Sequence, residues 1–482
     1  MGHITGTARE QLYLEAPCLD DFVSEDNIVR LIDAFIDSLD LAELGFRKVK
    51  ASPTGRPPYK PQHLTKLYVY GYLNRVRSSR RLEAEAGRNV EVMWLLNGLR
   101  PDDKTICNFR SDNRKALKNL FKAFNRFCQK VEMFGKETCS IDGSKFKAAN
   151  GRKNYHTVEE TQARIAKLDA AIEGYLAQLD ENDATEAANP IQETLEKLAK
   201  HRIKAEAVLA AIQENNNEPV CSIDPEAKLM KQPNNRGYDP SYNVQTAVDA
   251  KHGLIVDFAV TDAKNDHNQL EPMAFAAKEA MGSETINALG DGGYANGEQI
   301  HHCEQAGIRC YIPGMAPSNQ PQDPRFHRDR FLYDDQTDTY TCPQNLLLSF
   351  KGIKKRGNYR VYYNIAACKS CPLRQHCTQA AKRTIDRHPY QADVERAAAR
   401  TKTNRTLYAR RKELSEHPFG TIKAVWGYNQ FLCRGKEKTN AEAALTFLAF
   451  NLRRITNIKG TKWLLHHLLF SNCSSLRTLL PC

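Results

Sequence analysis

The chain has 482 residues, of which 41% are hydrophobic, enough for two to four domains with buried cores. Lysine and arginine outnumber aspartate and glutamate by 69 to 57, and the formal net charge of +12 favours a polyanionic partner. The chain has no run of about 18 apolar residues and no basic-then-apolar N-terminal signal, which argues against a membrane and leaves nucleic acid.

Residues 1–20 are expected to form an extended arm, and residues 21–134 a helical domain. Ser24 is the expected cap of a first helix that begins at Ile28, because apolar residues recur there at helical spacing. Further helices are predicted over 62–76, over 81–97 and from Thr105 through Phe127.

The last of these helices carries a basic face, with Arg110 and Arg114 expected to point outward. Short helices with such a face resemble a helix-turn-helix DNA reader. The alternative is a solvated charged face on an ordinary bundle. The charge of the whole chain favours DNA binding.

Residues 135–154 are predicted to begin the core of the protein with a strand that ends in an acid. Asp142 closes a short apolar run and is followed at once by Gly143 and Lys145. Aspartate is disfavoured in strands, and a buried carboxylate is costly without a partner. A metal or phosphate site is therefore expected, although a capping or salt-bridged Asp142 would look the same.

Residues 155–218 are predicted to form an insertion that is an antiparallel coiled-coil hairpin. Two segments there have apolar residues at alternating spacings of three and four, with a polar turn between them, which is typical of such a hairpin. The core is expected to resume over 219–313. Strands over 242–248 and 254–260 form a predicted hairpin, and a later strand delivers Asp291 followed by two glycines. Asp291 is thus presented much as Asp142 is.

Residues 314–385 look like a second insertion, rich in proline, glutamine and aspartate. Four thiols, two of them spaced C-x-x-C, suit a tetrahedral structural Zn²⁺ site, with unligated reduced thiols as the alternative. These are Cys342, Cys368, Cys371 and Cys377.

Residues 386–458 are predicted to be helical and to carry a third acid, Glu416. Tyr408, Lys412 and Glu416 are four residues apart, and Lys423 lies seven beyond Glu416, so one unbroken helix would align all four. Pro418 argues against an unbroken helix, and Ser415 is then the expected cap of a new one. A later helix is expected to start with a capping box over residues 439–442.

The order of Asp142, a hairpin, Asp291 and then helical Glu416 with Lys423 resembles the DDE transposases of bacterial insertion sequences. The C-terminal stretch is similar to the Y-R-E-K signature of the IS-four-like group. Tyr408, Glu416 and Lys423 match it, whereas the basic position falls at Lys412 with Arg411 one residue off. The resemblance covers about residues 10 to 457.

This resemblance implies an α/β fold with an RNase H-like mixed-sheet core, together with the helical domain and the two insertions. It also implies two Mg²⁺ (or Mn²⁺) ions held by Asp142, Asp291 and Glu416. The expected reaction is cleavage at the ends of the element and joining of the 3′-OH ends to target DNA. Phosphate or DNA contacts are expected from Lys145, Tyr408, Arg411, Lys412, Lys423, Arg110 and Arg114.

The expected partner is double-stranded DNA, bound by a homo-oligomer in the bacterial cytoplasm at the nucleoid. Two alternatives stay open, namely a catalytically inactive DNA-binding relative and a metal-dependent nuclease that does not join strands. The tail over 459–482 carries no motif that indicates a role.

Overall fold

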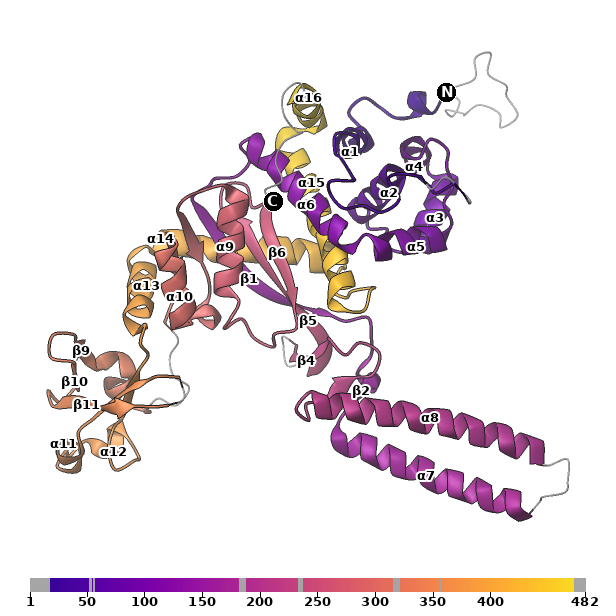
Figure 1. The fold of residues 1–482 in the computed structure, drawn as a ribbon. Coiled ribbons are helices and arrows are strands. Elements are labelled where there is room, and N and C mark those ends of the chain that lie inside the picture. The colour runs from indigo at the N-terminus through magenta and orange to yellow at the C-terminus, as the bar shows by residue number, and fades with distance from the viewer. Residues whose placement is uncertain are drawn as a thin grey trace, which may run out of the picture.

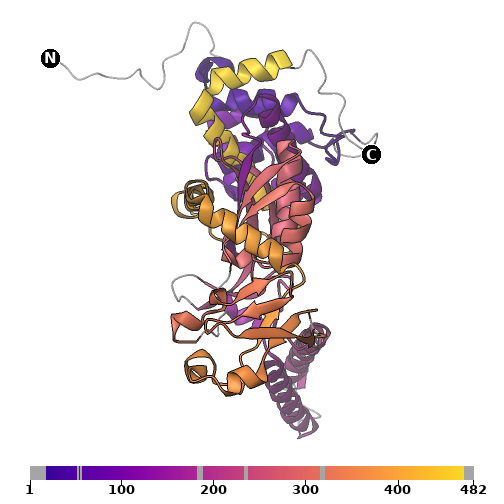
Figure 2. The same ribbon diagram turned by 90° about the vertical axis from the view of Figure 1, so that its left-hand side faces the viewer.

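The computed structural model describes residues 18–51, 54, 57–181, 188–232, 237–314, 321–355 and 357–471. The fold mixes helices with a mixed sheet, as predicted for an α/β protein. The N-terminal helices lie at one end of the central sheet, and two insertions project from the other end (Figures 1 and 2). The expected N-terminal arm up to residue 17, and the tail from residue 472, lie outside the described residues.

The N-terminal region is built from short helices. They are α1 (Ile28–Asp37), α2 (Pro61–Leu73), α3 (Ser79–Arg88), α4 (Val90–Leu95), α5 (Asp103–Asp112) and α6 (Arg114–Lys130). One helix was predicted over 81–97 and another from Thr105 to Phe127, and these predictions are wrong in one respect. Each region forms two helices, which meet at Asn89 and at Asn113.

The side chains of these asparagines explain the breaks. Asn89 accepts a hydrogen bond from the backbone of Glu91 and caps α4. Asn113 accepts from the backbone N–H of Arg47 at 2.7 Å, which ties the junction of α5 and α6 to a distant loop. The first helix is likewise capped by Asn27, which replaces Ser24 as the predicted cap.

The central sheet is mixed. Its strands are β1 (Thr138–Lys147), β4 (Lys228–Lys231), β5 (Tyr238–Asp249), β6 (Ile255–Thr261), β7 (Ile286–Leu289) and β8 (Ile308–Tyr311). β5 pairs antiparallel with β1, β4 and β6, which confirms the predicted hairpin. β7 is parallel to β1, and β8 is parallel to β7.

β1 does not end at Asp142, so the predicted end of this strand is wrong. β5 pairs with β1 from Cys139 through Lys147 and keeps it extended. The parallel neighbour β7 stops earlier, at the pair of Ser140 with Leu289. Asp142 therefore lies inside β1, at the point where only one neighbouring strand remains.

Helices cover both faces of this sheet (Figure 2). α9 (Leu270–Met281) packs against β5 and β6, and α10 (Gly297–Gln305) follows it on the chain. α13 (Gln391–Thr403) leads into α14 (Arg405–Gly420), which packs on β1.

α15 (Lys436–Lys459) joins the sheet to the N-terminal helices, since it contacts α2, α6 and β6. The buried amide of Asn451 donates to Asn125 Oδ1 at 3.0 Å and to the carbonyl of Ile255 at 2.8 Å. The helical domain and the sheet thus share one continuous core.

The capping box expected at residues 439–442 is wrong, because α15 already begins at Lys436. Glu442 is instead fully buried and accepts hydrogen bonds from the backbone of Leu432 and Cys433. Its carboxylate also pairs with Arg77 at 3.1 Å, which fastens the N-terminal domain to the core.

The first insertion is a pair of long helices, α7 (Val158–Glu181) and α8 (Ala188–Glu214), that extends away from the sheet (Figure 1). Two short strands, β2 (Tyr155–His156) and β3 (Val220–Cys221), pair at its base.

The second insertion is a small antiparallel sheet with two short helices and its own core. Its elements are β9 (Leu332–Asp334), β10 (Thr339–Thr341), β11 (Leu347–Ile353), β12 (Arg360–Tyr363), α11 (Ile365–Lys369), α12 (Arg374–Cys377) and β13 (Ile385–Arg387).

No role was predicted for the tail over 459–482. Its first part forms α16 (Thr461–Ser471), which packs against α1. Across the described ranges, no helix has the length and apolar character needed to cross a lipid bilayer.

Candidate active site

Asp142 and Asp291 lie side by side at the edge where β7 stops. In the parallel register Ser140 pairs with Leu289, and each aspartate stands two residues further along its own chain segment. Asp291 Oδ1 accepts from the backbone N–H of Gly293 at 2.8 Å and caps a short 3₁₀ turn. The carboxyl end of β7 and the interior of its parallel neighbour β1 thus bring the two predicted acids to one place.

The electrostatics of Asp142 agree with this arrangement. The pKa of Asp142 is raised to about 6, chiefly by burial, and the negative charges of Asp291 and Asp266 contribute to the rise. The guanidinium of Arg411 and the backbone N–H of Gly143 act in the opposite direction. The site therefore concentrates negative charge beside one arginine.

α14 lies across β1 and presents Tyr408, Arg411 and Ser415 to the sheet. The Tyr408 hydroxyl donates to the carbonyl of Gly290 at 3.2 Å, directly before Asp291. Ser415 is buried, with its Oγ 2.8 Å from Ser140 Oγ. Ser415 is therefore not a helix cap, and of the two alternatives the unbroken helix is correct as far as Gly420.

Pro418 lies inside α14, and a π-helical turn over Thr421–Val425 follows directly. A π-turn realigns the backbone hydrogen bonds near a residue that cannot donate one. Pro418 and Phe419 are buried, and the ring of Phe419 packs 6.1 Å from that of Phe146 on β1. Tertiary packing thus keeps the proline inside the helix.

Lys423 projects inward from the π-helical turn. Its ammonium donates at 2.6 Å to Ser144 Oγ and at 2.6 Å to the carbonyl of Lys145, and it lies 4.3 Å from the centre of the Phe146 ring. Burial lowers the pKa of Lys423 to about 8, while the nearby charge of Asp142 opposes that change. Lys423 therefore holds the turn against the strand that carries Asp142.

Glu416 is the predicted acid that the structure does not bring against the other two. It is exposed on α14, one residue after Ser415, and it forms no hydrogen bond or ion pair with another described residue. Among the described residues, no three His, Cys, Asp or Glu side chains are grouped closely enough to hold a metal ion. The structure thus pairs Asp142 with Asp291 and leaves Glu416 on the helix that covers them.

A polar network beneath Gly143 was not predicted. Asp266 Oδ1 accepts from Asn243 Nδ2 at 2.8 Å and from Gln245 Nε2 at 2.6 Å, and Gln245 Oε1 accepts from the Tyr294 hydroxyl. A Cβ at Gly143 would lie 2.3 Å from Gln245 Nε2 and 2.5 Å from Asp266 Oδ1, so any other residue there would displace this network.

Strand alternation explains the position of this network. Asp142 shares a face of β1 with Ser140 and Ser144, so the network approaches Gly143 from the opposite face. The sequence did hold one signal for it, namely two amides, Asn243 and Gln245, at alternate positions of the buried strand β5.

The predicted DNA contacts divide into buried and accessible side chains. The expectation that Arg110 points outward is wrong: it is 9% exposed and donates to the Tyr72 hydroxyl at 3.2 Å, because two tyrosines of α2 pack around it. Arg114 pairs with Glu437 of α15 at 2.8 Å. Lys145 donates to the carbonyl of Lys231, and Lys412 is exposed on α14.

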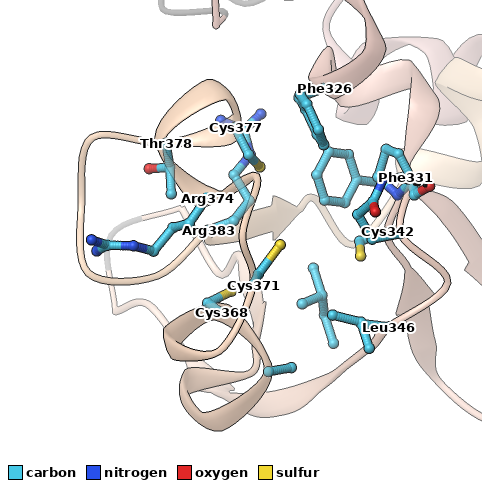
Figure 3. A pocket seen from close by; sticks show the side chains of 14 residues that line it. Phe326, Phe331, Cys342, Leu346, Cys368, Cys371, Arg374, Cys377, Thr378 and Arg383 are labelled. Carbon is cyan, nitrogen blue, oxygen red and sulfur yellow. Dashed lines mark hydrogen bonds between the residues drawn. The ribbon is translucent and has the colours of Figure 1, made fainter.

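The four thiols of the second insertion border one small cavity (Figure 3). They come from the β10–β11 turn, from α11 and the turn after it, and from the end of α12. In the structure all four are free thiols.

Two family matches cover separate parts of the chain. The family described as "Transposase domain (DUF772)" matches residues 17–112, which include α1 to α5. The family described as "Transposase DDE domain" matches residues 341–456, from the thiol-bearing insertion through α14 into α15. No curated protein and no solved structure matches the chain. A transposase family thus matches each of two separate parts of the chain, and together the two matches support a DDE transposase of an insertion sequence.

Proposed function

We propose that this transposase binds the ends of an insertion sequence, cleaves the DNA and joins the 3′-OH ends to target DNA by metal-dependent phosphoryl transfer. The proximity of Asp142, inside β1, to Asp291, just after the end of the parallel strand β7, is the observation that carries this proposal. A mixed sheet with acids at this position also supports the RNase H-like core implied by the resemblance.

The donor set fits divalent cations that prefer oxygen. Asp142 and Asp291 are partly exposed carboxylates whose negative charges repel each other, and a bound divalent cation would relieve that repulsion. Mg²⁺ binds through one or two carboxylates plus phosphate oxygens. Asp142 and Asp291 are the proposed holders of two Mg²⁺ or Mn²⁺ ions, with Glu416 as the third carboxylate. The chemistry that such ions supply is activation of the attacking oxygen and stabilisation of the leaving oxygen.

The protein's own residues position the reacting strand. Arg411 supplies a positive charge beside Asp142 and is the proposed contact for a backbone phosphate. Tyr408 fixes the carbonyl before Asp291, and Lys423 fixes the strand after Asp142. Lys412, which is exposed on α14 beside Arg411, is the proposed contact for a second backbone phosphate. A DNA-binding role for these cations agrees with the net charge of +12.

Double-stranded DNA is the proposed partner, both as element ends and as target, and the chain is proposed to act on it as a homo-oligomer. The test uses the full purified chain, Mg²⁺ and linear duplexes that cover the DNA on either side of the coding sequence. The expected result is cleavage followed by strand joining, both abolished in Asp142→Asn and in Asp291→Asn.

Glu416→Gln has a matched control on the same helix, Glu413→Gln, which changes another exposed carboxylate. We expect Glu416→Gln to lose cleavage and Glu413→Gln to keep it, while both still shift the duplex in a gel. Equal activity of these two variants would remove Glu416 from the site.

Two other functions predict different products in the same assay. A nuclease that does not join strands would give cleavage alone. A DNA-binding relative without catalysis would give gel shifts with no cleavage under any divalent cation.

A further inference from the structure

The second insertion contains a cluster of cysteines, here called the thiol cluster, with no role in the proposed DNA chemistry. Its members are Cys342, Cys368, Cys371 and Cys377. We propose that the thiol cluster binds one structural Zn²⁺ ion that holds the second insertion folded.

The backbone around the thiol cluster already has short turns at the required places. Cys342 opens a tight turn, in which Asn345 N–H donates to its carbonyl at 2.8 Å and its own N–H donates to Leu346 at 2.9 Å. Cys371 N–H approaches the carbonyl of Cys368 at 3.4 Å, so the C-x-x-C pair shares one helical turn. A hairpin turn and a helical turn thus place thiols on opposite sides of one cavity (Figure 3).

The cavity between these turns is small and apolar. It measures about 30 Å³ and is also lined by Phe326, Phe331 and Leu348. All four cysteines of the thiol cluster border this one cavity.

Arg383 supplies an independent observation. Its Nε lies buried at the cavity and has no hydrogen-bond partner among the residues that the structure describes. A buried N–H without an acceptor is costly, and metal-bound thiolates accept such hydrogen bonds from the groups around them. Thiolates bound to Zn²⁺ would give Arg383 both an acceptor and a compensating charge.

The core of the second insertion is too small to explain its fold without a further constraint. Its buried side chains, among the described residues, are Phe326, Phe331, Tyr340, Leu348, Tyr362, Cys377 and Ile385. Units below about 70 residues usually need disulfides or a structural metal, because apolar burial alone leaves little net stability. The four thiols are free in this structure, and a metal bound by them would supply such a constraint.

The four Sγ atoms border the cavity without yet meeting at one point, since the described residues contain no ready group of three metal ligands. Each cysteine has a single side-chain torsion with three staggered positions, so the direction of its Sγ can change without movement of the backbone. A tetrahedral site needs Zn–S distances of about 2.3 Å. Each thiol that binds loses its proton to solvent, so affinity falls as the pH is lowered.

The test measures zinc in the full chain, purified with a reductant and without a chelator, by plasma mass spectrometry. We expect about one zinc per chain. Cys342→Ser and Cys377→Ser should lose it, whereas Cys107→Ser, which changes an exposed thiol on α5, should keep it.

A second measurement on the unchanged chain remains informative if a variant fails to fold. Zinc is removed with a chelator under reducing conditions and Co²⁺ is added, which should give the visible and thiolate charge-transfer bands of a tetrahedral sulfur site. Removal should also expose the segment over 321–387 to protease while α7 and α8 keep their cleavage pattern. The proposal fails if the chain carries no zinc and takes up neither Zn²⁺ nor Co²⁺, or if Cys342→Ser and Cys377→Ser retain a full equivalent. Either failure leaves the DNA chemistry untouched.

Discussion

Replacement of Asp142 by asparagine should stabilise the metal-free chain while abolishing DNA cleavage. Burial and neighbouring acids raise the pKa of Asp142 from 3.8 to about 6. Above pH 6 the Asp142 carboxylate is therefore ionised in surroundings that destabilise its negative charge. A shift of about two pKa units, at about 1.36 kcal/mol per unit, corresponds to a cost of about 3 kcal/mol. Asparagine keeps the acceptor for the Gly143 N–H and removes the charge.

The pH dependence follows from the direction of the shift. A carboxyl whose folded pKa is raised contributes most to stability when protonated, and that contribution is lost as the pH rises from about 4 to about 6. The advantage of Asp142→Asn should therefore be small at pH 4 and reach about 1–3 kcal/mol at pH 7.5. For a folding unit of 150–250 residues this raises Tm by about 2–4 °C per kcal/mol.

The assay is thermal and urea unfolding of the wild-type chain and Asp142→Asn in EDTA at both pH values, with Glu413→Gln as the exposed control. Under the proposed function, Mg²⁺ should then stabilise the wild-type chain and not Asp142→Asn. If Asp142→Asn is no more stable than the wild-type chain at pH 7.5 in EDTA, the Asp142 carboxylate does not destabilise the folded chain.

Three further changes probe the surroundings of the site. Gly143→Ala should cost about 1–3 kcal/mol in urea unfolding, because its Cβ would lie 2.3 Å from Gln245 Nε2, while Gly151→Ala, where nothing lies within 4 Å, should be tolerated. Lys423→Met keeps the packing on Phe146 and loses two hydrogen bonds. The pKa of Lys423 is lowered to about 8, below the ordinary value of about 10.5, so the wild-type chain should gain stability relative to this variant as the pH rises from 8 to 10.5. A stability difference that does not change with pH would contradict the inward position of the ammonium. Glu442→Gln weakens a buried ion pair and should lower the free energy of unfolding by about 3 kcal/mol. The measurement is limited proteolysis between the helical domain and the sheet, which should become faster. Unchanged proteolysis would show that Glu442 does not fasten the two together.

The sequence predicted those elements whose causes are local. The hairpin of β5 and β6 follows from two apolar runs with a turn between them, and the placement of Asp291 follows from an apolar strand that ends in an acid and glycines. Both signals are contained within a few neighbouring residues.

The errors have causes that lie far along the chain. β1 extends past Asp142 because β5, which is supplied about a hundred positions later, pairs with it through Lys147. Arg110 is buried because tyrosines of α2 surround it, and Pro418 stays helical because Phe419 packs on Phe146. Asp266 went unnoticed because its partners on β5 become visible only when the sheet is assembled.

The contact between Lys423 and Ser144 joins residues that are 279 positions apart in the chain. At about 5–20 residues per second, a ribosome needs about 15 to 55 seconds to make the segment between them. During that time the newly made chain can already pair β1 with β5 and β7, while Arg411 and Lys423 do not yet exist. Under the proposed function, a transposase molecule becomes able to cut DNA only late in its own synthesis, and a chain that stops early carries the two aspartates without the cations that complete the site.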